Sequence, residues 1–597
     1  MPTGGGKSLC YQVPGLAKDG LCLVISPLIA LMKDQVENLR KKNITAFAIY
    51  SGMSRKELIN TLKVASHSNC KFLYVSPERL ETALFKEYLP ALAINLVAVD
   101  EAHCISQWGY DFRPPYLRIA ALREELPGIP VLALTASATT EVQNDICQKL
   151  DFKRKNIFRQ SFERPNLSYS VFKVDSRINK IIEILKNVPG SSIVYCKSRR
   201  RTKEISDLLK MHGLSADFYH AGLTQEERNS KQKEWIKDET RVIICTNAFG
   251  MGIDKPGVRI VVHADPPDCL ENYYQEAGRA GRDGKKAFAV LLYDGKVIQE
   301  LEGLAQLRYP VVEEIRQVYQ GIANYLQIPS GIGEGEYFDF DLTDFIKKFK
   351  LNAHTAAYSL KVLEQEGWMS FSEHVFLPPT VQFTTDKNYL YQFEKDWPPL
   401  EPLIKTLLRV YEGIFEYPAS ISENILSQLL KKEKELVKKE LVQLHQHRII
   451  EYRPQKDTPQ LLFLRNRVRS EELLIDIKSF NDRKEKFIVR SKSIIRYIHE
   501  RVECRSRMIA AYFGDHEINN CGICDNCLKQ KSTHLTSGEF EAIHRRIVDS
   551  VKQHSIHSKE LLQKLNGVKK EKAWKVLLFL QAENKNELDK AGWIRLK

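Results

Sequence analysis

Short apolar runs alternate with longer amphipathic segments over the first half of the chain. One set of runs reads LCLVISP, KFLYVSP, LVAVDEAH and PVLALTASAT, and the next reads SSIVYC, ADFYHA, VIICTN, IVVHAD and AFAVLLYD. Each run is brief, rich in β-branched residues and followed by polar or turn residues, which is typical of a buried strand. Because amphipathic segments such as LIALMKDQVENLRKK separate them, the pattern predicts parallel βαβ units. We expect two consecutive α/β domains, 1–155 and 156–300, joined near FERPNLSYSV.

Beyond residue 300 the apolar period becomes helical. Three segments share the order of short helix, turn, longer helix and strand-like end, which is the outline of a winged helix. They lie at 301–395, 396–470 and 535–597, and a helix with a cysteine cluster occupies 471–530. A small helical bundle with a hairpin has a similar pattern, and winged helices also bind proteins. Contact with DNA by at least one of the three is therefore a hypothesis.

Composition gives a weak indication of the partner. The 597 residues include 89 Lys and Arg against 75 Asp and Glu, a formal net charge of +14. This balance suits a polyanion, although a solvated basic surface has the same composition. The sequence has no secretory signal, and its longest apolar run, LCLVISPLIALM, is too short to span a bilayer. We expect a cytoplasmic protein without a membrane partner.

The stretch MPTGGGKSLCYQ has the composition of a nucleotide phosphate cradle. Glycine N–H groups can turn inward on phosphate oxygens, Lys7 can reach the β- and γ-phosphates, and Ser8 can hold Mg²⁺. The predicted ligands of ATP and Mg²⁺ are Thr3, Gly4, Gly5, Gly6, Lys7 and Ser8. Met1 stands where the strict pattern has glycine, and no strand precedes the loop, so the match alone also fits a chance glycine turn.

Two adjacent carboxylates, Asp100 and Glu101, follow the predicted strand LVAV. Hydrolysis of a phosphoanhydride needs one carboxylate to hold Mg²⁺ and another to orient the attacking water. We assign Asp100 to the metal and Glu101 to the water. The alternative is an ordinary acidic strand terminus.

The segment YYQEAGRAGRDG in the second domain carries Arg279 and Arg282, three residues apart. On a helix this spacing puts both on one face, from which they can reach a γ-phosphate held by the first domain. A guanidinium supplied across a cleft stabilises transition-state charge and makes hydrolysis depend on domain closure. The alternative is a solvated arginine pair between glycine turns.

The twelve cysteines form two groups. Eight are scattered through the first half, where we expect buried thiols that pack as small apolar groups. The other four are clustered: Cys504, Cys521, Cys524 and Cys527. Two C-x₂-C steps and a fourth thiol favour a closed tetrahedral Zn²⁺ site, with an iron–sulfur cluster or free thiols as alternatives.

The motifs TGGGKS, DEAH, TASAT and QEAGRAGRDG, in this order, resemble those of superfamily-two helicases. More narrowly, MPTGGGKSLCYQ, AHCISQWGYDFRPPYLRI, FERPNL, IVYC, HAGL and TNAFGMGIDKPGVR resemble the RecQ family, as do the cysteine cluster and its lead-in ECRSRMIAAYFGD. The resemblance covers residues 1–295 and the cysteines. It implies two RecA-like motor domains in an ATP-driven DNA helicase that moves 3′ to 5′ on single strands, with Gln275 as a further catalytic residue.

The resemblance also implies DNA contacts next to the acidic motif. Ring faces and a planar cation there can stack on unpaired bases; the residues concerned are Gln107, Trp108, Phe112 and Arg113. A buried aromatic cluster is the alternative. Further strand contacts are expected at SPERL, at TNAFGMGIDKP and at Ser26 and Pro27 in SPLIALMKDQ. The residues expected to couple this loop to the ATP site are His103, Thr135 and Ser137.

The chain departs from the RecQ pattern in two places. The zinc module of that family usually follows the second motor domain directly, whereas here 301–470 lies between them. The strand before the phosphate loop, and the upstream segment that carries an adenine-reading glutamine in related helicases, would precede Met1. We therefore expect a chain truncated at its N-terminus.

These observations predict a monomeric DNA helicase that uses ATP, Mg²⁺ and Zn²⁺. Its expected partners are single-stranded DNA and duplex or junction DNA, its expected role is in recombination and repair, and its expected location in a bacterium is the nucleoid. Two alternatives remain. One is an RNA helicase or translocase with the same motor, and the other is a non-enzymatic, multi-winged-helix DNA-binding protein with an inactive motor.

Overall fold

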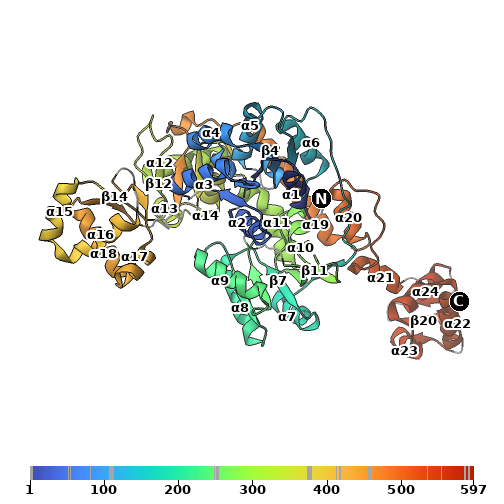
Figure 1. Ribbon diagram of the computed structural model, residues 1–597. Coiled ribbons are helices and arrows are strands. Elements are labelled where there is room, and N and C mark those ends of the chain that lie inside the picture. The colour runs from blue at the N-terminus through green and yellow to red at the C-terminus, as the bar shows by residue number, and fades with distance from the viewer. Residues whose placement is uncertain are drawn as a thin grey trace.

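The computed structural model describes residues 5–596 with internal gaps (Figure 1). The gaps are 28, 51–52, 54, 81, 107–112, 248, 250–254, 373–378, 412, 416–417, 455–458, 534, 553, 584–585 and 589–591. Within the described residues, no helix combines the length and the apolar character needed to cross a membrane.

The first domain is built on a five-stranded parallel sheet of order β2-β3-β1-β4-β5. Its strands are β1 (Leu21–Ile25), β2 (Ala46–Ile49), β3 (Phe72–Val75), β4 (Ile94–Val99) and β5 (Val131–Ala133). The helices are α1 (Leu9–Leu16), α2 (Ile29–Lys41), α3 (Arg55–His67), α4 (Ala83–Tyr88), α5 (Ile119–Glu125) and α6 (Thr140–Lys149). One core lies between the sheet and α1 and α2, and a second lies between the opposite face and α3 to α6. The predicted α/β fold is confirmed, since every expected run forms a strand.

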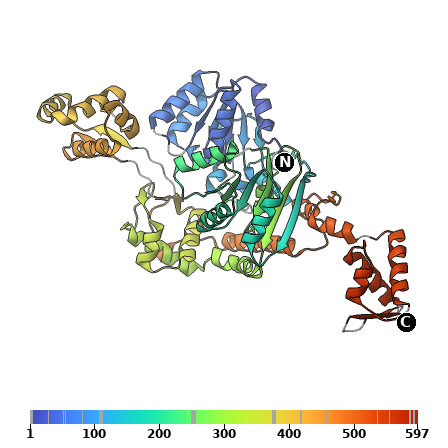
Figure 2. The ribbon, with the colours of Figure 1, turned by 90° about the horizontal axis from the view of Figure 1, so that it is seen from below.

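The second domain has a six-stranded parallel sheet of order β6-β11-β10-β7-β9-β8 (Figure 2). Its strands are β6 (Leu167–Lys173), β7 (Ser191–Tyr195), β8 (Ala216–Tyr219), β9 (Val242–Cys245), β10 (Val258–His263) and β11 (Ala287–Tyr293). The helices are α7 (Arg177–Asn187), α8 (Arg199–Met211), α9 (Gln225–Ile236) and α10 (Leu270–Ala277). The sequence pattern predicted all of these strands except β6, which the join at FERPNLSYSV delivers to the sheet.

The third region is a winged helix, and a large insertion separates two strands of its sheet in the sequence. Its elements are α11 (Gly295–Arg308), α12 (Val312–Tyr325), β12 (Tyr337–Asp339), α13 (Leu342–Phe349), α14 (Ala353–Gln365), β13 (Met369–Ser372) and β17 (Gln460–Phe463). The antiparallel sheet has the order β12-β17-β13. Since β13 pairs directly with β17, a complete second winged helix lies between two neighbouring strands of the first.

This nested winged helix has its own sheet, of order β15-β14-β16, and its own core. Its elements are β14 (Thr380–Phe383), α15 (Lys387–Asp396), α16 (Glu401–Val410), β15 (Ala419–Ser420), α17 (Glu423–Leu430), α18 (Lys434–Gln446) and β16 (Ile450–Arg453). The predicted boundary between 301–395 and 396–470 is wrong, because it cuts α15, whose Leu390 and Phe393 pack in the nested core. The predicted boundary at residue 470 is also wrong. It places β17 in the second winged helix, whereas β17 pairs with β12 and β13 of the first.

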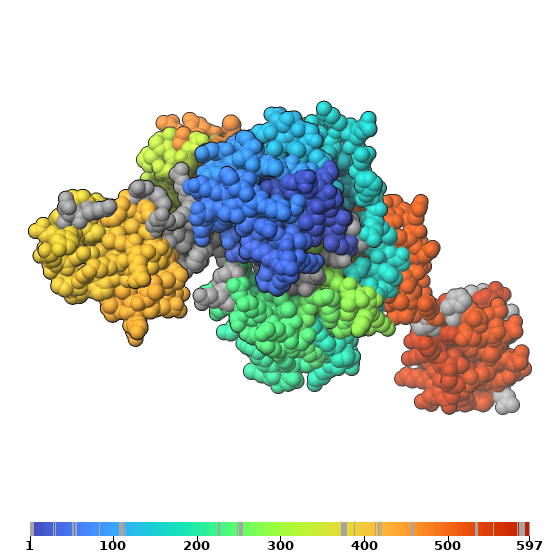
Figure 3. Space-filling view, in the orientation of Figure 1, coloured from blue at the N-terminus to red at the C-terminus, as the bar shows by residue number. Residues whose placement is uncertain are grey.

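The remaining chain forms the cysteine module and a C-terminal winged helix. The module contains α19 (Ile477–His499), α20 (Arg505–Tyr512) and α21 (Asp525–Thr533). The C-terminal elements are α22 (Ser537–Val551), β18 (Ile556–His557), α23 (Ser558–Lys564), α24 (Lys570–Ala582), β19 (Asn586–Leu588) and β20 (Trp593–Leu596), with sheet order β18-β20-β19. The nested and C-terminal winged helices lie at opposite ends of the molecule (Figure 3).

Short 3-10 helices connect several of these elements. Those in the described residues are η1 (Pro77–Arg79), η2 (Leu89–Ala91), η3 (Ala102–Ile105), η4 (Pro114–Arg118), η5 (Pro398–Leu400) and η6 (Ser470–Glu472). Of these, η3 directly follows the acidic pair, so it belongs to the candidate site.

Candidate nucleotide and metal sites

The glycine loop leads directly into α1, which packs against β1 and β4. Gly6 has a φ of +80°, a left-handed conformation that favours glycine, and Ser8 is the residue before the first helical turn. Gly5 precedes this turn, while Thr3 and Gly4 lie outside the described residues. The loop therefore has the helix-terminal position expected of a phosphate cradle.

Both predicted carboxylates lie at the carboxyl end of β4, where β1 and β4 run side by side. The amide of Asp100 donates to the carbonyl of Ile25 at 2.9 Å, which ties the first carboxylate to the end of β1. Glu101 has a left-handed φ of 48°, and its amide donates to the Oδ1 of Asp100 at 2.9 Å. This turn aims both side chains at the glycine loop.

Lys7 reaches both carboxylates. Its Nζ lies 2.6 Å from the Oε1 of Glu101 and 3.7 Å from the Oδ1 of Asp100. Burial alone raises the pKa of the Glu101 carboxyl, but Lys7, with smaller contributions from His103 and Arg279, holds it below its ordinary value. Burial raises the pKa of Asp100, and Lys7 offsets this only in part. The ammonium and the Glu101 carboxylate are therefore a charged pair of low exposure.

The predicted coupling residues gather beside this pair, within the first domain. The Nδ1 of His103 lies 3.0 Å from the Oγ1 of Thr135 and 3.3 Å from the Oε2 of Glu101. The amide of Ser137 donates to the same Thr135 hydroxyl at 3.4 Å. The TASAT motif at the end of β5 thus contacts the acidic motif at the end of β4 through one buried histidine.

The predicted DNA contacts are only partly described. Gln107, Trp108 and Phe112 lie outside the described residues. Arg113 donates from Nη1 to the carbonyl of Pro27 at 3.2 Å, next to the buried Ser26. The end of the post-acidic loop therefore contacts the SPLIALM segment that follows β1.

The predicted arginines do not share a helix. Helix α10 carries the half-buried Gln275 but ends at Ala277, and Arg279 and Arg282 follow in turns. The expectation of one helical face is wrong, because Gly278 ends the helix and Gly281, with a φ of +63°, continues the turn. Arg279 is only 7% exposed, yet its charge lowers the pKa of Glu101 in the first domain. The charge of this arginine therefore reaches Glu101 from the second domain.

Two residues outside the predicted site hold this arginine turn. Arg164 donates to the carbonyls of Gly278, Ala280 and Gly281 at 3.1, 2.9 and 3.2 Å. Asn166 donates to the carbonyl of Gly281 at 2.7 Å. Both belong to FERPNL, so the sequence contained the signal, but only the fold brings this segment beside the turn.

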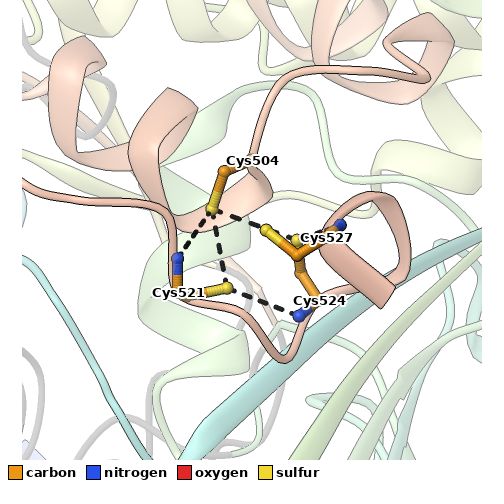
Figure 4. Close-up of side chains that lie close together, drawn as sticks. All are labelled: Cys504, Cys521, Cys524 and Cys527. Carbon is orange, nitrogen blue, oxygen red and sulfur yellow. Dashed lines mark hydrogen bonds between the residues drawn. The ribbon is translucent and has the colours of Figure 1, made fainter. Parts of the chain in front are cut away.

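The four predicted zinc ligands form one cluster (Figure 4). Their sulfur atoms all lie within 4.8 Å of one another, and the Sγ atoms of Cys504 and Cys521 are 3.5 Å apart. Four thiolates at 2.3 Å from a tetrahedral zinc are about 3.8 Å apart, so the cluster fits that ion. Backbone amides of Cys521, Cys524 and Cys527 point at cluster sulfurs, which stabilises thiolate charge.

The cysteine module shares its core with the second domain. Phe513 of the module stacks on Phe162 at 4.6 Å between ring centres, and Cys504, Cys524 and Cys527 belong to the same buried cluster as the inner face of that sheet. Ser168 on β6 donates to the carbonyl of Ile523 at 2.7 Å. The module is therefore an extension of the second domain.

Two parallel-sheet domains, with a lysine and carboxylates on one and an arginine turn on the other, define the class of two-domain nucleotide-dependent motors. Four families match parts of the sequence: DEAD/DEAH box helicase (1–146), Helicase conserved C-terminal domain (176–284), RecQ helicase winged-helix domain, Bacteroidota (381–454) and RecQ zinc-binding (464–528). The chain belongs to the RecQ family of helicases. The predicted family is confirmed.

Two relatives come from Bacillus subtilis (strain 168). The ATP-dependent DNA helicase RecQ is 46% identical over 49% of this chain and 50% of its own length, and the probable ATP-dependent DNA helicase RecS is 42% identical over 53% and 65%. The chain thus spans half to two thirds of the length of these relatives. A solved structure of Mycobacterium smegmatis helicase Lhr bound to ssDNA and AMP-PNP matches 63% of this chain and 54% of that chain at 18% identity, with a TM-score of 0.41.

Proposed function

We propose that the protein is an ATP- and Mg²⁺-dependent DNA helicase that moves 3′ to 5′ along a single strand. The observation that carries this proposal is the Lys7, Asp100 and Glu101 cluster on one domain, with the charge of Arg279 acting on it from the other. The relatives named as DNA helicases and the zinc cluster support DNA over RNA as the partner.

Each residue of the cluster has a role in this proposal. Lys7 exchanges its Glu101 partner for the β- and γ-phosphates of ATP, and this exchange frees Glu101 to orient the attacking water. Ser8 and Asp100 would hold Mg²⁺, which would neutralise phosphate charge. Arg279 and Arg282 stabilise the charge that develops on the γ-phosphate. Hydrolysis then requires both domains to be in place.

The C-terminal winged helix is the proposed contact for duplex DNA. Residues 535–597 contain thirteen Lys and Arg against eight Asp and Glu, and Lys569, Lys570 and Lys575 are exposed at the start of α24. In helix-turn-helix proteins the start of the second helix of the motif, here α24 after α23, contacts the major groove of DNA. The nested domain, by contrast, has eleven of each sign over 381–454, and its Lys434 and Lys438 both lie 3.9 Å from Glu423. In the first winged helix, the second helix of the α13–α14 pair, α14, is packed against α11 and α12.

The test is ATP hydrolysis by the purified chain with and without single-stranded DNA. We expect DNA to stimulate hydrolysis, and we expect Lys7→Ala or Glu101→Gln to reduce it by about 10³-fold or more. The matched controls are Lys18→Ala and Glu124→Gln, which remove exposed charges of the same domain. Hydrolysis that ignores DNA, or that survives both changes, contradicts the proposal. Stimulation by RNA alone favours an RNA translocase, and unwinding of 5′-tailed rather than 3′-tailed duplexes contradicts the direction.

A further inference from the structure

Tyr116 lies in η4, close to the acidic pair, and has no role in the site described above. Its side chain is fully buried and packs in the core between the sheet of the first domain and α3 to α6. Its hydroxyl donates to the backbone carbonyl of Asp100 at 3.0 Å. Within the described part of the chain, this is the hydrogen bond that the Asp100 carbonyl accepts.

The Asp100 carbonyl belongs to the peptide that joins the two carboxylate residues. On the other side of Asp100, its amide is anchored separately, to the carbonyl of Ile25 at 2.9 Å. Glu101 has a φ of 48°, a left-handed conformation that is unfavourable for a residue with a Cβ. Rotation of the Asp100–Glu101 peptide changes this φ. The hydroxyl of Tyr116 therefore opposes relaxation of the left-handed turn.

The 3-10 helix η4 is attached to both ends of the acidic turn. The amide of Arg113 donates to the carbonyl of Cys104 at 2.9 Å, and the amide of Tyr116 donates to the carbonyl of Arg113 at 3.0 Å. The backbone of η4 is thus attached to η3, after the turn, while the Tyr116 hydroxyl holds the carbonyl at its start. Between these two points lies Glu101, whose Oε1 is 2.6 Å from the Nζ of Lys7. A change in the turn would move this carboxylate away from the glycine loop.

We propose that Tyr116 is a positioning residue for ATP hydrolysis, whose hydroxyl holds the Asp100–Glu101 peptide so that the Glu101 carboxylate can orient the attacking water. This inference rests on the proposed function, because that function gives Glu101 its task. Tyr116 acts through the backbone of the acidic pair and contacts neither nucleotide nor DNA. Its contribution is therefore the same with and without a bound strand.

The experiment compares Tyr116→Phe with Tyr309→Phe. Tyr309 is a matched control, because its buried hydroxyl donates to the backbone carbonyl of Arg483 at 3.1 Å, in the core of the first winged helix. Each variant keeps the ring and removes one donor from a buried carbonyl.

We expect Tyr116→Phe to lower kcat by about ten-fold and to leave KM for ATP within about two-fold, since Lys7 and the glycine loop are unchanged. Tyr309→Phe should keep the wild-type kcat. Equal kcat values for the two variants overturn the inference.

Hydrolysis with and without an oligo-dT strand separates this role from a contact with DNA. Because Tyr116 holds the turn in both conditions, we expect basal and stimulated kcat to fall by the same factor, within about two-fold. A variant that keeps the wild-type basal kcat and loses only the stimulation overturns the inference.

A donor of the same shape provides a rescue. With 4-aminophenylalanine at position 116, an N–H group replaces the O–H donor, so we expect kcat within about three-fold of wild type. A kcat as low as that of Tyr116→Phe overturns the inference, because a role in packing alone does not need a donor.

Amide hydrogen exchange without ATP separates this inference from the proposed function. The amides of Ala102 and Cys104 donate to the carbonyls of Leu134 and Glu101, both at 2.9 Å. We expect Tyr116→Phe to speed exchange of these two amides by about ten-fold, and Tyr309→Phe to leave it unchanged. If exchange speeds up in a chain that does not hydrolyse ATP, the proposed function fails and the hold of Tyr116 on the turn stands. If exchange and kcat both stay at the wild-type values while DNA stimulates hydrolysis, the inference fails and the function stands.

Discussion

The two halves of the candidate ATP site are held in different ways. In the first domain, the Nζ of Lys7 is held by side chains, at 2.6 Å from Glu101 and 3.7 Å from Asp100. In the second, the side chains of Arg164 and Asn166 grip the backbone that carries Arg279. The first half must exchange partners when a phosphate enters, whereas the second presents its arginine already oriented. We infer that binding of the nucleotide rearranges the side chains of the first half. Closure of the two domains then brings Arg279 of the second half to the nucleotide.

The largest expected effect comes from replacing the guanidinium of Arg279. We expect Arg279→Lys to lower the DNA-stimulated kcat by about 10³-fold, because lysine cannot reproduce the planar guanidinium at the γ-phosphate. Binding of a fluorescent ATP analogue should change by less than about three-fold, since Lys7 and the loop remain. An ATPase assay with an analogue titration checks both. If binding of the analogue fell as much as kcat, Arg279 would also be needed to bind the nucleotide, and the two halves of the site would not have separate roles.

A large effect on stability is expected at the zinc cluster. Elemental analysis should find about one zinc per chain. Cys524→Ser should lose the zinc and lower the midpoint of the second domain by about 10 °C, because the module and that domain share one core. Differential scanning calorimetry with a chelator provides the measurement. If the module unfolds in a separate, earlier transition and the second domain unfolds at its original temperature, the two do not share a core. The part of the second domain that carries Arg279 would then be stable without zinc.

A smaller effect is expected where the arginine turn is gripped. Arg164→Ala removes three hydrogen bonds to carbonyls, so we expect kcat to fall by about ten-fold while KM for ATP stays within about two-fold. Arg159→Ala is the control, since Arg159 also donates a hydrogen bond but on the exposed surface, to Gln143. Steady-state kinetics with saturating single-stranded DNA gives both values. If Arg164→Ala kept the wild-type kcat, the turn that carries Arg279 would hold its conformation without the hydrogen bonds from Arg164.

The smallest effect is expected at the exposed ion pair between the cysteine module and the first domain. Lys486 on α19 contacts Glu141 on α6, with both side chains more than a third exposed. We expect Lys486→Ala to change the free energy of unfolding by less than about 0.5 kcal/mol, because solvent screens such pairs. Urea denaturation measures it. A loss above about 1 kcal/mol would indicate that this contact, and not closure on nucleotide, holds the first domain in place.

Local pattern alone was enough to predict the strands of the two sheets except β2 and β6, the placement of Asp100 and Glu101 and the cysteine cluster. Buried parallel strands need apolar runs, catalytic side chains follow strand ends, and closely spaced thiols can converge on one metal without distant partners. Each of these features depends on neighbours in sequence. The family motifs added the order of the parts.

Only the tertiary structure decided the features that depend on distant segments. The pairing of β13 with β17 nests one winged helix inside another, and no local period records which strands pair across such an insertion. Likewise, Arg164 reaches the turn at Gly281, and the module of Cys504 joins the second core, because the folded sheets bring these segments together. The sequence by itself determined which chemical groups the protein carries, and long-range packing decided how each of them is held.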